Sequence, residues 1–410
     1  KVSMSESTDF DICLFRQPIL NVRLDVWGYA VDLCKSNDLE HGECTSALLD
    51  PDALQNGLQL AEHTAPTPTI KCVHLDQSLL ENHERVEFPP DTLVALSEKA
   101  TPNAAVLALC EAMQNRALLA VDITSNTERL QPFVRLADIA IVDLRQFSEE
   151  GLRRKAAQLH ECNVTLLARN VDGYASLQQA RELGFELFQG FFFTNSRTIS
   201  HKDLSTSQVA KLQLLEQLGH PDNLEELTLT IKNDVSTSYR LLKYLNSPGM
   251  GLMNEVKSIP HAVKLLGEKK IKNWIRALLL SEVIRDDKPG ELINLSVSRA
   301  AFLQYLSQQA RAPLPPESMY LLGLFSLLDV ILDQPMSQVL KYLALDDSIR
   351  LTLQGDNTPD RQWLDLAIRL ERGDWTAVQF HLASLGLTAD EVTQAYTAAL
   401  IHTHSFFSHS

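Results

Sequence analysis

The chain has 410 residues, 45% of them hydrophobic and 22% charged, which is typical of a folded protein with two or three domains. Its formal net charge of −15 argues against binding to nucleic acids or anionic membranes, since both need clustered Lys and Arg. No apolar run approaches the length of a transmembrane helix, and the first residues lack an apolar signal core, so we expect a cytoplasmic protein without membrane contact.

The first half of the chain alternates strand-like and helix-like segments. Short apolar runs predict strands at 12–20, 26–34, 69–75, 117–123, 138–144, 164–168 and 185–193. Amphipathic stretches predict helices at 45–61, 91–99, 103–115, 149–162 and 174–183. This alternation predicts an α/β fold with a parallel sheet covered by helices, and about eight strands fit a closed barrel.

The cysteines all lie in the first half, at Cys13, Cys34, Cys44, Cys72, Cys110 and Cys162. They form no Cys-x-x-Cys pair, and no His lies at zinc-finger spacing from them. Several occupy apolar strand-like runs, so we expect buried free thiols instead of disulfides or metal ligands.

A Ser- and Thr-rich stretch at 194–207 has no apolar period and predicts a linker, which divides the chain into domains 1–200 and 201–410. Beyond it the spacing of apolar residues is helical almost throughout. Helices are predicted at 209–217, 223–233, 235–246, 258–266, 269–285, 291–310, 318–333, 337–345, 360–371, 375–385 and 389–403. Short connections between them favour an all-helical bundle.

A series of short motifs runs in order through residues 10–200. It begins with Arg16-Gln17-Pro18-Ile19 and Gly28-Tyr29, continues through 120–123, 137–143 and 166–172, and ends with Gln189-Gly190-Phe191. This series resembles the EAL family, whose active members hydrolyse cyclic di-GMP. The resemblance implies a TIM-like (β/α)8 barrel with two divalent ions held by carboxylates at the carboxyl rim.

Several metal-site positions of that family are replaced here. Ala30 stands where the motif Glu is a metal ligand, and Ile123, Ile141 and Arg169 stand where active relatives carry Asp, Lys and Glu. An Arg in the pocket also repels cations. From the resemblance we therefore expect no metal, no cofactor and no catalytic residue.

Three residues remain as candidates for ligand binding. Gln17 and Gln189 match amides that flank the nucleotide in active relatives, and Asp122 keeps a family carboxylate. The alternative interpretation is structural, with both glutamines as remnants of the barrel and Asp122 as a helix cap.

The second half contains Asn246-Ser247-Pro248, followed by His261-Ala262 and Leu266-Gly267 at a characteristic separation. These pieces, within 209–285, resemble the HDOD domain, a helical relative of the HD metal phosphohydrolases. Ser326-Leu327 stands where an HD-type helix would carry its His-Asp ligand doublet. The whole chain is similar to proteins in which a degenerate EAL barrel precedes an HDOD domain.

These replacements favour a protein that is not an enzyme. The first hypothesis is a catalytically inactive bacterial signal-transduction scaffold, in which both domains act through protein–protein contacts. The alternative is a receptor that binds cyclic di-GMP without hydrolysis, and the third hypothesis is a residual cyclic di-GMP phosphodiesterase. The resemblance also allows a homodimer, because EAL barrels often pair.

Overall fold

The computed structural model describes residues 12–195 and 256–407, apart from 43, 45–48, 65–68, 82–85, 98, 115, 124–127, 257, 284–287 and 344, with scattered residues between 204 and 245. The predicted helix 223–233, the motif at 246–248 and most of the predicted linker lie outside the described residues. Contacts divide the chain into two compact units. The barrel unit is Phe10–Arg197 with Asp365–Thr397, and the helical unit is Lys1–Asp9, Thr198–Leu364 and Ala398–Ser410.

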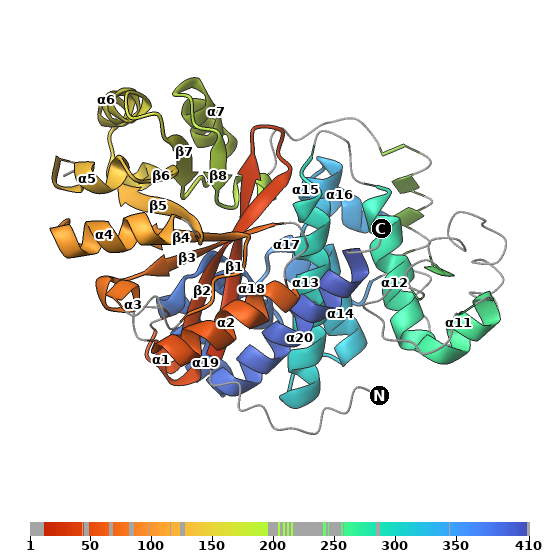
Figure 1. Ribbon diagram of the computed structural model, residues 1–410. Helices are drawn as coiled ribbons and strands as arrows, with labels where there is room; N and C mark the ends of the chain where they lie inside the picture. The colour runs from red at the N-terminus through yellow and green to blue at the C-terminus, as the bar shows by residue number, and fades with distance from the viewer. Residues whose placement is uncertain are drawn as a thin grey trace. The chain divides into compact units, whose positions relative to one another are not determined.

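The barrel unit is built on eight strands that close in sequence order (Figure 1). β1 pairs antiparallel with both β2 and β8, and all other neighbours are parallel. The predicted closed barrel is thus confirmed. The strands are β1 (Ile12–Asn21), β2 (Val26–Lys35), β3 (Ile70–Leu75), β4 (Thr92–Leu96), β5 (Leu118–Ile123), β6 (Ile139–Asp143), β7 (Thr165–Arg169) and β8 (Leu187–Gln189).

The helix predicted at 91–99 is wrong, because these residues form β4. All residues of Thr92–Leu96 are buried, and the strand lies between β3 and β5 in the parallel part of the sheet. A strand buried on both faces has a continuous apolar run without alternation, so periodicity cannot separate it from a short buried helix.

Helices follow most of the strands. They are α1 (Ser36–Glu40), α2 (Pro51–Thr64), α3 (Gln77–Glu81), α4 (Ala104–Met113), α5 (Gln131–Val134), α6 (Glu149–His160) and α7 (Tyr174–Glu182). Asn103 and Ser148 cap α4 and α6, because each side chain accepts a hydrogen bond from a backbone N–H of the first turn. The barrel lumen is filled by an apolar cluster that includes Ile19, Ala30 and Cys72.

A segment from the end of the chain belongs to the barrel unit. It comprises the end of α18 (Arg361–Arg372), all of α19 (Trp375–Leu385) and the first half of α20 (Ala389–Phe407). The ring of Phe15 on β1 has its centroid 4.8 Å from that of Trp375 and 5.1 Å from that of Tyr396. The start of β1 is thus covered by residues from the far end of the sequence.

The helical unit contains α11 (Ile259–Leu266), α12 (Glu268–Ser281), α13 (Glu291–Gln309), α14 (Pro316–Phe325), α15 (Leu328–Leu332), α16 (Met336–Val339) and α17 (Asp347–Gln354). α13 is buried along most of its length and serves as the central helix. The helix predicted at 318–333 is divided into α14 and α15, with Ser326 and Leu327 at the break. A buried ion pair of 2.7 Å joins Lys288 to Asp333.

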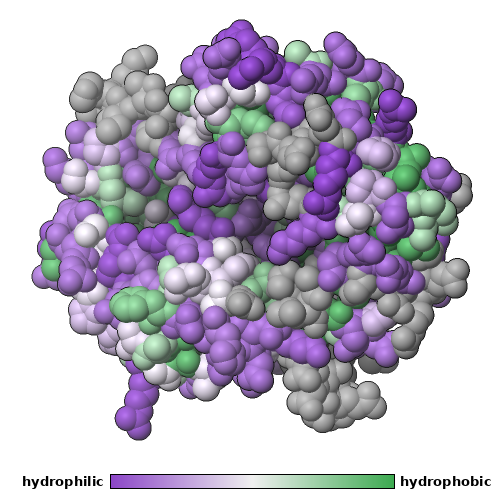
Figure 2. Space-filling view, turned by 90° about the vertical axis from the view of Figure 1, so that its left-hand side faces the viewer, coloured by the Kyte–Doolittle hydropathy of each residue, from purple (hydrophilic) through white to green (hydrophobic). Residues whose placement is uncertain are grey.

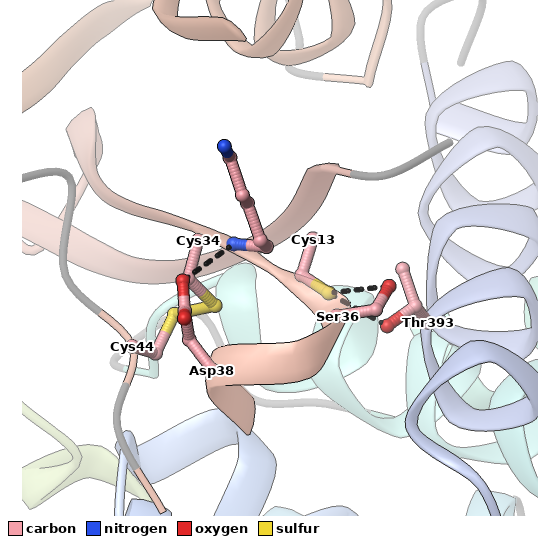
Figure 3. Close-up of a disulfide and its surroundings, with 7 residues drawn as sticks. Cys13, Cys34, Ser36, Asp38, Cys44 and Thr393 are labelled. Carbon is pink, nitrogen blue, oxygen red and sulfur yellow. Dashed lines mark hydrogen bonds between the residues drawn. A yellow bond between two sulfur atoms is a disulfide. The ribbon is translucent and has the colours of Figure 1, made fainter. Parts of the chain in front are cut away.

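The expectation of free thiols is wrong for one pair, since Cys34 and Cys44 form a disulfide (Figure 3). The chain folds back through α1, a helix that the sequence did not predict, and brings the two Cα atoms to 4.9 Å. This separation lies within the reach of a disulfide. Cys13, Cys72 and Cys110 are free and buried, as expected.

The surface shown in Figure 2 is mostly hydrophilic, and its apolar residues form separate small patches. Among the described residues, no single helix has the length and apolar composition to cross a membrane. The helices Pro316–Leu332 and Met336–Tyr342 meet that criterion only as a pair, and the chain bends by 109° between them.

Candidate functional site

The candidate site lies where the carboxyl ends of β2–β8 meet the first half of the antiparallel strand β1. Side chains alternate across a strand, so the residue two positions beyond an apolar lumen residue also faces the lumen. Six polar residues lie two positions from apolar lumen residues at this end: one lies two positions before Ile19 on the antiparallel strand β1, and the others lie two positions beyond Ala30, Cys72, Ala120, Leu167 and Leu187. We call them the lumen-end cluster: Gln17, Asp32, His74, Asp122, Arg169 and Gln189.

Three members of the cluster form an ionic network. Arg169 donates from Nη1 to Asp122 Oδ1 over 2.9 Å, and His74 Nε2 lies 3.5 Å from the other carboxylate oxygen. The same Arg169 nitrogen lies 3.4 Å from His74 Nε2. The three side chains come from β3, β5 and β7, so the closed sheet brings together residues far apart in sequence.

The network sets the charge of its members. Burial opposes ionisation of Asp122, but His74 and Arg169 outweigh it and hold the pKa of this carboxyl below its usual range. Burial likewise opposes protonation of His74, yet the charge of Asp122 and their hydrogen bond leave the pKa of His74 raised. Burial raises the pKa of Asp32, although His74 and Arg169 partly oppose the shift.

The two glutamines predicted from the sequence meet directly. Gln189 Nε2 donates to Gln17 Oε1 over 3.0 Å, which joins the last strand to the first. Of the sequence candidates, these two therefore share one side of the lumen end, and Asp122 pairs with Arg169 in the same layer. The structure gives Asp122 an ionic partner within the barrel, not the helix-capping role considered from sequence.

Asp32 and His74 were not among the candidates from sequence. Comparison with the EAL motif drew attention to Ala30, which lies one layer deeper, and to positions where family carboxylates are lost. Counting two residues onward from Ala30 and Cys72 would have found both side chains, because the alternation of a strand fixes the face.

The divalent ions implied by the EAL resemblance do not fit these residues. The charge of Asp122 is already compensated by Arg169, and a guanidinium 2.9 Å from the carboxylate repels a second cation. Within the described part of the chain, no group of three or more His, Cys, Asp and Glu side chains is arranged to hold a metal ion.

In the helical unit, the two residues at the expected His-Asp position have structural contacts. The hydroxyl of Ser326 accepts from Arg299 over 2.7 Å and donates to the carbonyl of Gly323 over 2.6 Å. Leu327 is buried between α14 and α15. This position therefore ends a helix and packs the core.

Residues 205–344 match the family model of the HDOD domain. Two curated proteins are similar over almost the whole chain. "Uncharacterized protein YuxH" of Bacillus subtilis is 28% identical over 95% of this chain and 97% of its own length. "Cyclic di-GMP phosphodiesterase CdgJ" of Vibrio cholerae is 27% identical over 95% of this chain and 91% of its own length.

Among solved structures, the chain is similar to a standalone EAL protein from Vibrio cholerae O395 in its c-di-GMP-bound form. The TM-score is 0.37 at 18% identity, with coverage of 46% of this chain and 93% of that chain. Residues 205–344 thus match the HDOD family model, and the chain is similar over almost its whole length to a protein named a cyclic di-GMP phosphodiesterase.

The expectation that the chain is not an enzyme is wrong, because the relative CdgJ, matched from end to end, is named a phosphodiesterase. The expectation was based on individual replaced positions such as Ala30 and Ile141. It overlooked the other ionisable groups, Asp32 and His74, that the barrel brings to the same end.

Proposed function

We propose that the protein is a bacterial cyclic di-GMP signalling protein whose barrel binds this nucleotide at the lumen-end cluster. The observation that carries the proposal is the placement of Arg169 and the Gln17–Gln189 pair at the carboxyl end of a closed barrel. Barrel proteins bind their ligands at this end. We take cyclic di-GMP as the ligand because the relative CdgJ, which is similar over almost the whole chain, is named a cyclic di-GMP phosphodiesterase.

The chemistry of the cluster suits a cyclic dinucleotide. Arg169 is partly exposed and offers a guanidinium to a phosphate, while Asp122 keeps it oriented. A guanine edge presents both donors and acceptors, and a glutamine amide also presents both. Binding would exchange the hydrogen bond between Gln17 and Gln189 for bonds to the base.

Hydrolysis of the bound nucleotide is a second candidate function, favoured by the name of CdgJ and by the His74–Asp122 pair. In this scheme water attacks the phosphodiester phosphorus and gives its proton to Asp32, whose raised pKa makes it a stronger base. The P–O bond to the leaving ribose oxygen breaks, and His74 supplies that oxygen with a proton. The products are a phosphomonoester end and a free hydroxyl on a linear dinucleotide.

We also propose that the barrel and helical domains divide near residue 200 in sequence, and that the helical domain acts through contacts with other proteins. The match of 205–344 to the HDOD family supports this boundary. A homodimer through the barrel is compatible with the proposal, and sedimentation of the full chain measures it.

Calorimetric titration of the full chain with cyclic di-GMP tests binding. We expect Arg169→Met to weaken binding at least tenfold, since a charge-assisted bond to phosphate contributes about 1.5–3 kcal/mol. Arg153→Met is the matched control, because that side chain is 70% exposed on α6, outside the cluster. Absence of binding to the wild-type chain at high micromolar ligand overturns the proposal.

Chromatography of the same samples tests hydrolysis. We expect linear dinucleotide from the wild type and a rate at least tenfold lower from His74→Ala, with product formation continuing in the presence of a chelator. Equal rates of hydrolysis in the wild type and His74→Ala would exclude His74 as the proton donor. The binding proposal is tested separately by the calorimetric titration.

A further inference from the structure

The turn between α18 and α19, Glu371–Trp375, lies against the lumen-end cluster. A Cβ atom placed on Gly373 would lie 3.1 Å from Gln17 Nε2 and 3.7 Å from Asp32 Oδ2. Both of these side chains point into the lumen at its carboxyl end, so the backbone of Gly373 lies directly over them. All of these residues belong to the barrel unit.

The turn is anchored on both sides of the place where the glutamines meet. On one side, the ring of Trp375 packs against Phe15 of β1 at 4.8 Å between centroids. On the other, the guanidinium of Arg372 lies 5.9 Å from the ring centroid of Phe191, two residues beyond Gln189. The turn therefore reaches from β1 to the end of β8, across the Gln17–Gln189 pair.

Ring contacts and exposed polar contacts both hold the turn. Gly373 has φ of +66°, a left-handed conformation that glycine adopts readily and that alanine adopts only with strain. Asp374 caps α19 by accepting from the N–H of Ala377, and it pairs with Arg369 over 3.1 Å with both side chains at least 40% exposed. Exposed pairs contribute little, so the Asp374–Arg369 pair adds little to the hold on the turn.

We propose that this turn is an autoinhibitory contact that occupies the nucleotide's place, and that cyclic di-GMP binds only when the turn has moved away. The inference rests on the proposed function and names the regulation of the same site. A guanine that bonds to the amides of Gln17 and Gln189 needs the space that Gly373 fills. Turn and nucleotide therefore compete for the space beside Gln17.

The competition couples the barrel to the helical unit through the chain itself. The boundary between the units falls within α18, after Leu364, and again within α20, after Thr397. The turn is joined to the first boundary by the remaining residues of α18. Displacement of the turn by the nucleotide thus acts on a helix that enters the helical unit.

A matched pair of glycine substitutions tests the inference. Gly373→Ala strains the turn and brings a methyl group against Gln17. Gly386, at the end of α19, has φ of +65°, so Gly386→Ala imposes the same backbone strain. The methyl group added there would have no neighbouring atom within 4 Å. We expect Gly373→Ala to tighten binding of cyclic di-GMP about fivefold, since it lowers the population of the closed state. We expect Gly386→Ala to leave affinity unchanged.

Equal affinities for the wild type and Gly373→Ala, or weaker binding by the variant, overturn the inference and leave the proposed function standing. Absence of binding by the wild type and by both variants overturns the inference and the proposed function together. Circular dichroism and unfolding of both variants show whether each is folded, and Asp374→Ala, which loosens the turn without adding a methyl group, should repeat the gain.

Hydrogen exchange of the full wild-type chain gives an independent test. Saturating cyclic di-GMP should make the amides of residues 371–378 exchange faster, because the turn leaves the barrel. Slower exchange there would mean that the turn is a wall of the binding site, with Arg372 facing the ligand, and would overturn the inference.

Discussion

The ion pair between Arg169 and Asp122 lends itself to a quantitative test. Arg169→Met removes the guanidinium 2.9 Å from the carboxylate of Asp122, whose side chain is 12% exposed, and leaves the contact with His74. Breaking a fully buried pair costs about 3–5 kcal/mol. Because Arg169 is 22% exposed and His74 remains, we expect a loss of about 2–3 kcal/mol in the free energy of unfolding.

The companion variant Asp122→Asn separates the pair energy from other effects. The double variant should lose about 1.5–2 kcal/mol less than the sum of the two single losses, because no charge is then left uncompensated. Urea unfolding of the full chain at pH 7 measures the free energy of unfolding. Hydrogen exchange of the β5 and β7 amides then shows how much of the loss falls on the barrel. The surface pair Glu149–Arg153, with side chains 75% and 70% exposed, is the control and should couple by less than about 0.5 kcal/mol. Additive losses at Asp122 and Arg169 would refute the electrostatic reasoning.

Three further outcomes are expected. Replacing Cys34 and Cys44 together by Ser should lower the free energy of unfolding by about 2.7 kcal/mol, which is the loop-closure value for ten residues. Equal free energies of unfolding for the oxidised and reduced wild type would contradict this prediction. The pKa of His74 is raised in the folded state, so its contribution to stability is full below about pH 6.5 and is lost as the pH rises through the folded pKa. Proton NMR titration should show this shift in the wild type, and Asp122→Asn should reduce it. Trp375→Ala should destabilise the barrel by about 2 kcal/mol through lost packing on Phe15. The control is Phe380→Ala on the same helix, which should change stability by less than about 0.5 kcal/mol because Phe380 is 67% exposed. Equal effects of the two substitutions would place the segment outside the barrel core.

Much of the barrel was predictable because its strands are short, apolar and bounded by helices. β4 was the exception, since a fully buried strand has the same unbroken apolar run as a buried helix. At the site, the family motifs led to Gln17, Asp122 and Gln189. They did not lead to Asp32 or His74, because a motif comparison follows aligned positions and ignores which face of the strand a residue occupies.

The covering segment at 365–397 was predictable only as helices. An amphipathic pattern shows that a helix face is buried, but it does not show what the face packs against. The contacts of Trp375 and Tyr396 with Phe15 join residues about 360–380 positions apart in sequence, and no local signal records such a pairing. The same limit applies to the disulfide between Cys34 and Cys44, whose geometry depends on the short helix α1.

The discontinuity of the barrel unit has a consequence for its synthesis. The eighth strand ends at Gln189, but Trp375, which covers Phe15, is made about 186 residues later. At roughly 5–20 residues per second, the nascent barrel waits roughly 10–40 s before Trp375 can cover Phe15. During that interval Phe15 is accessible to chaperones and to neighbouring nascent chains. A protein produced from its first 200 residues alone would remain in this state, and its solubility would depend on what replaces the missing cover.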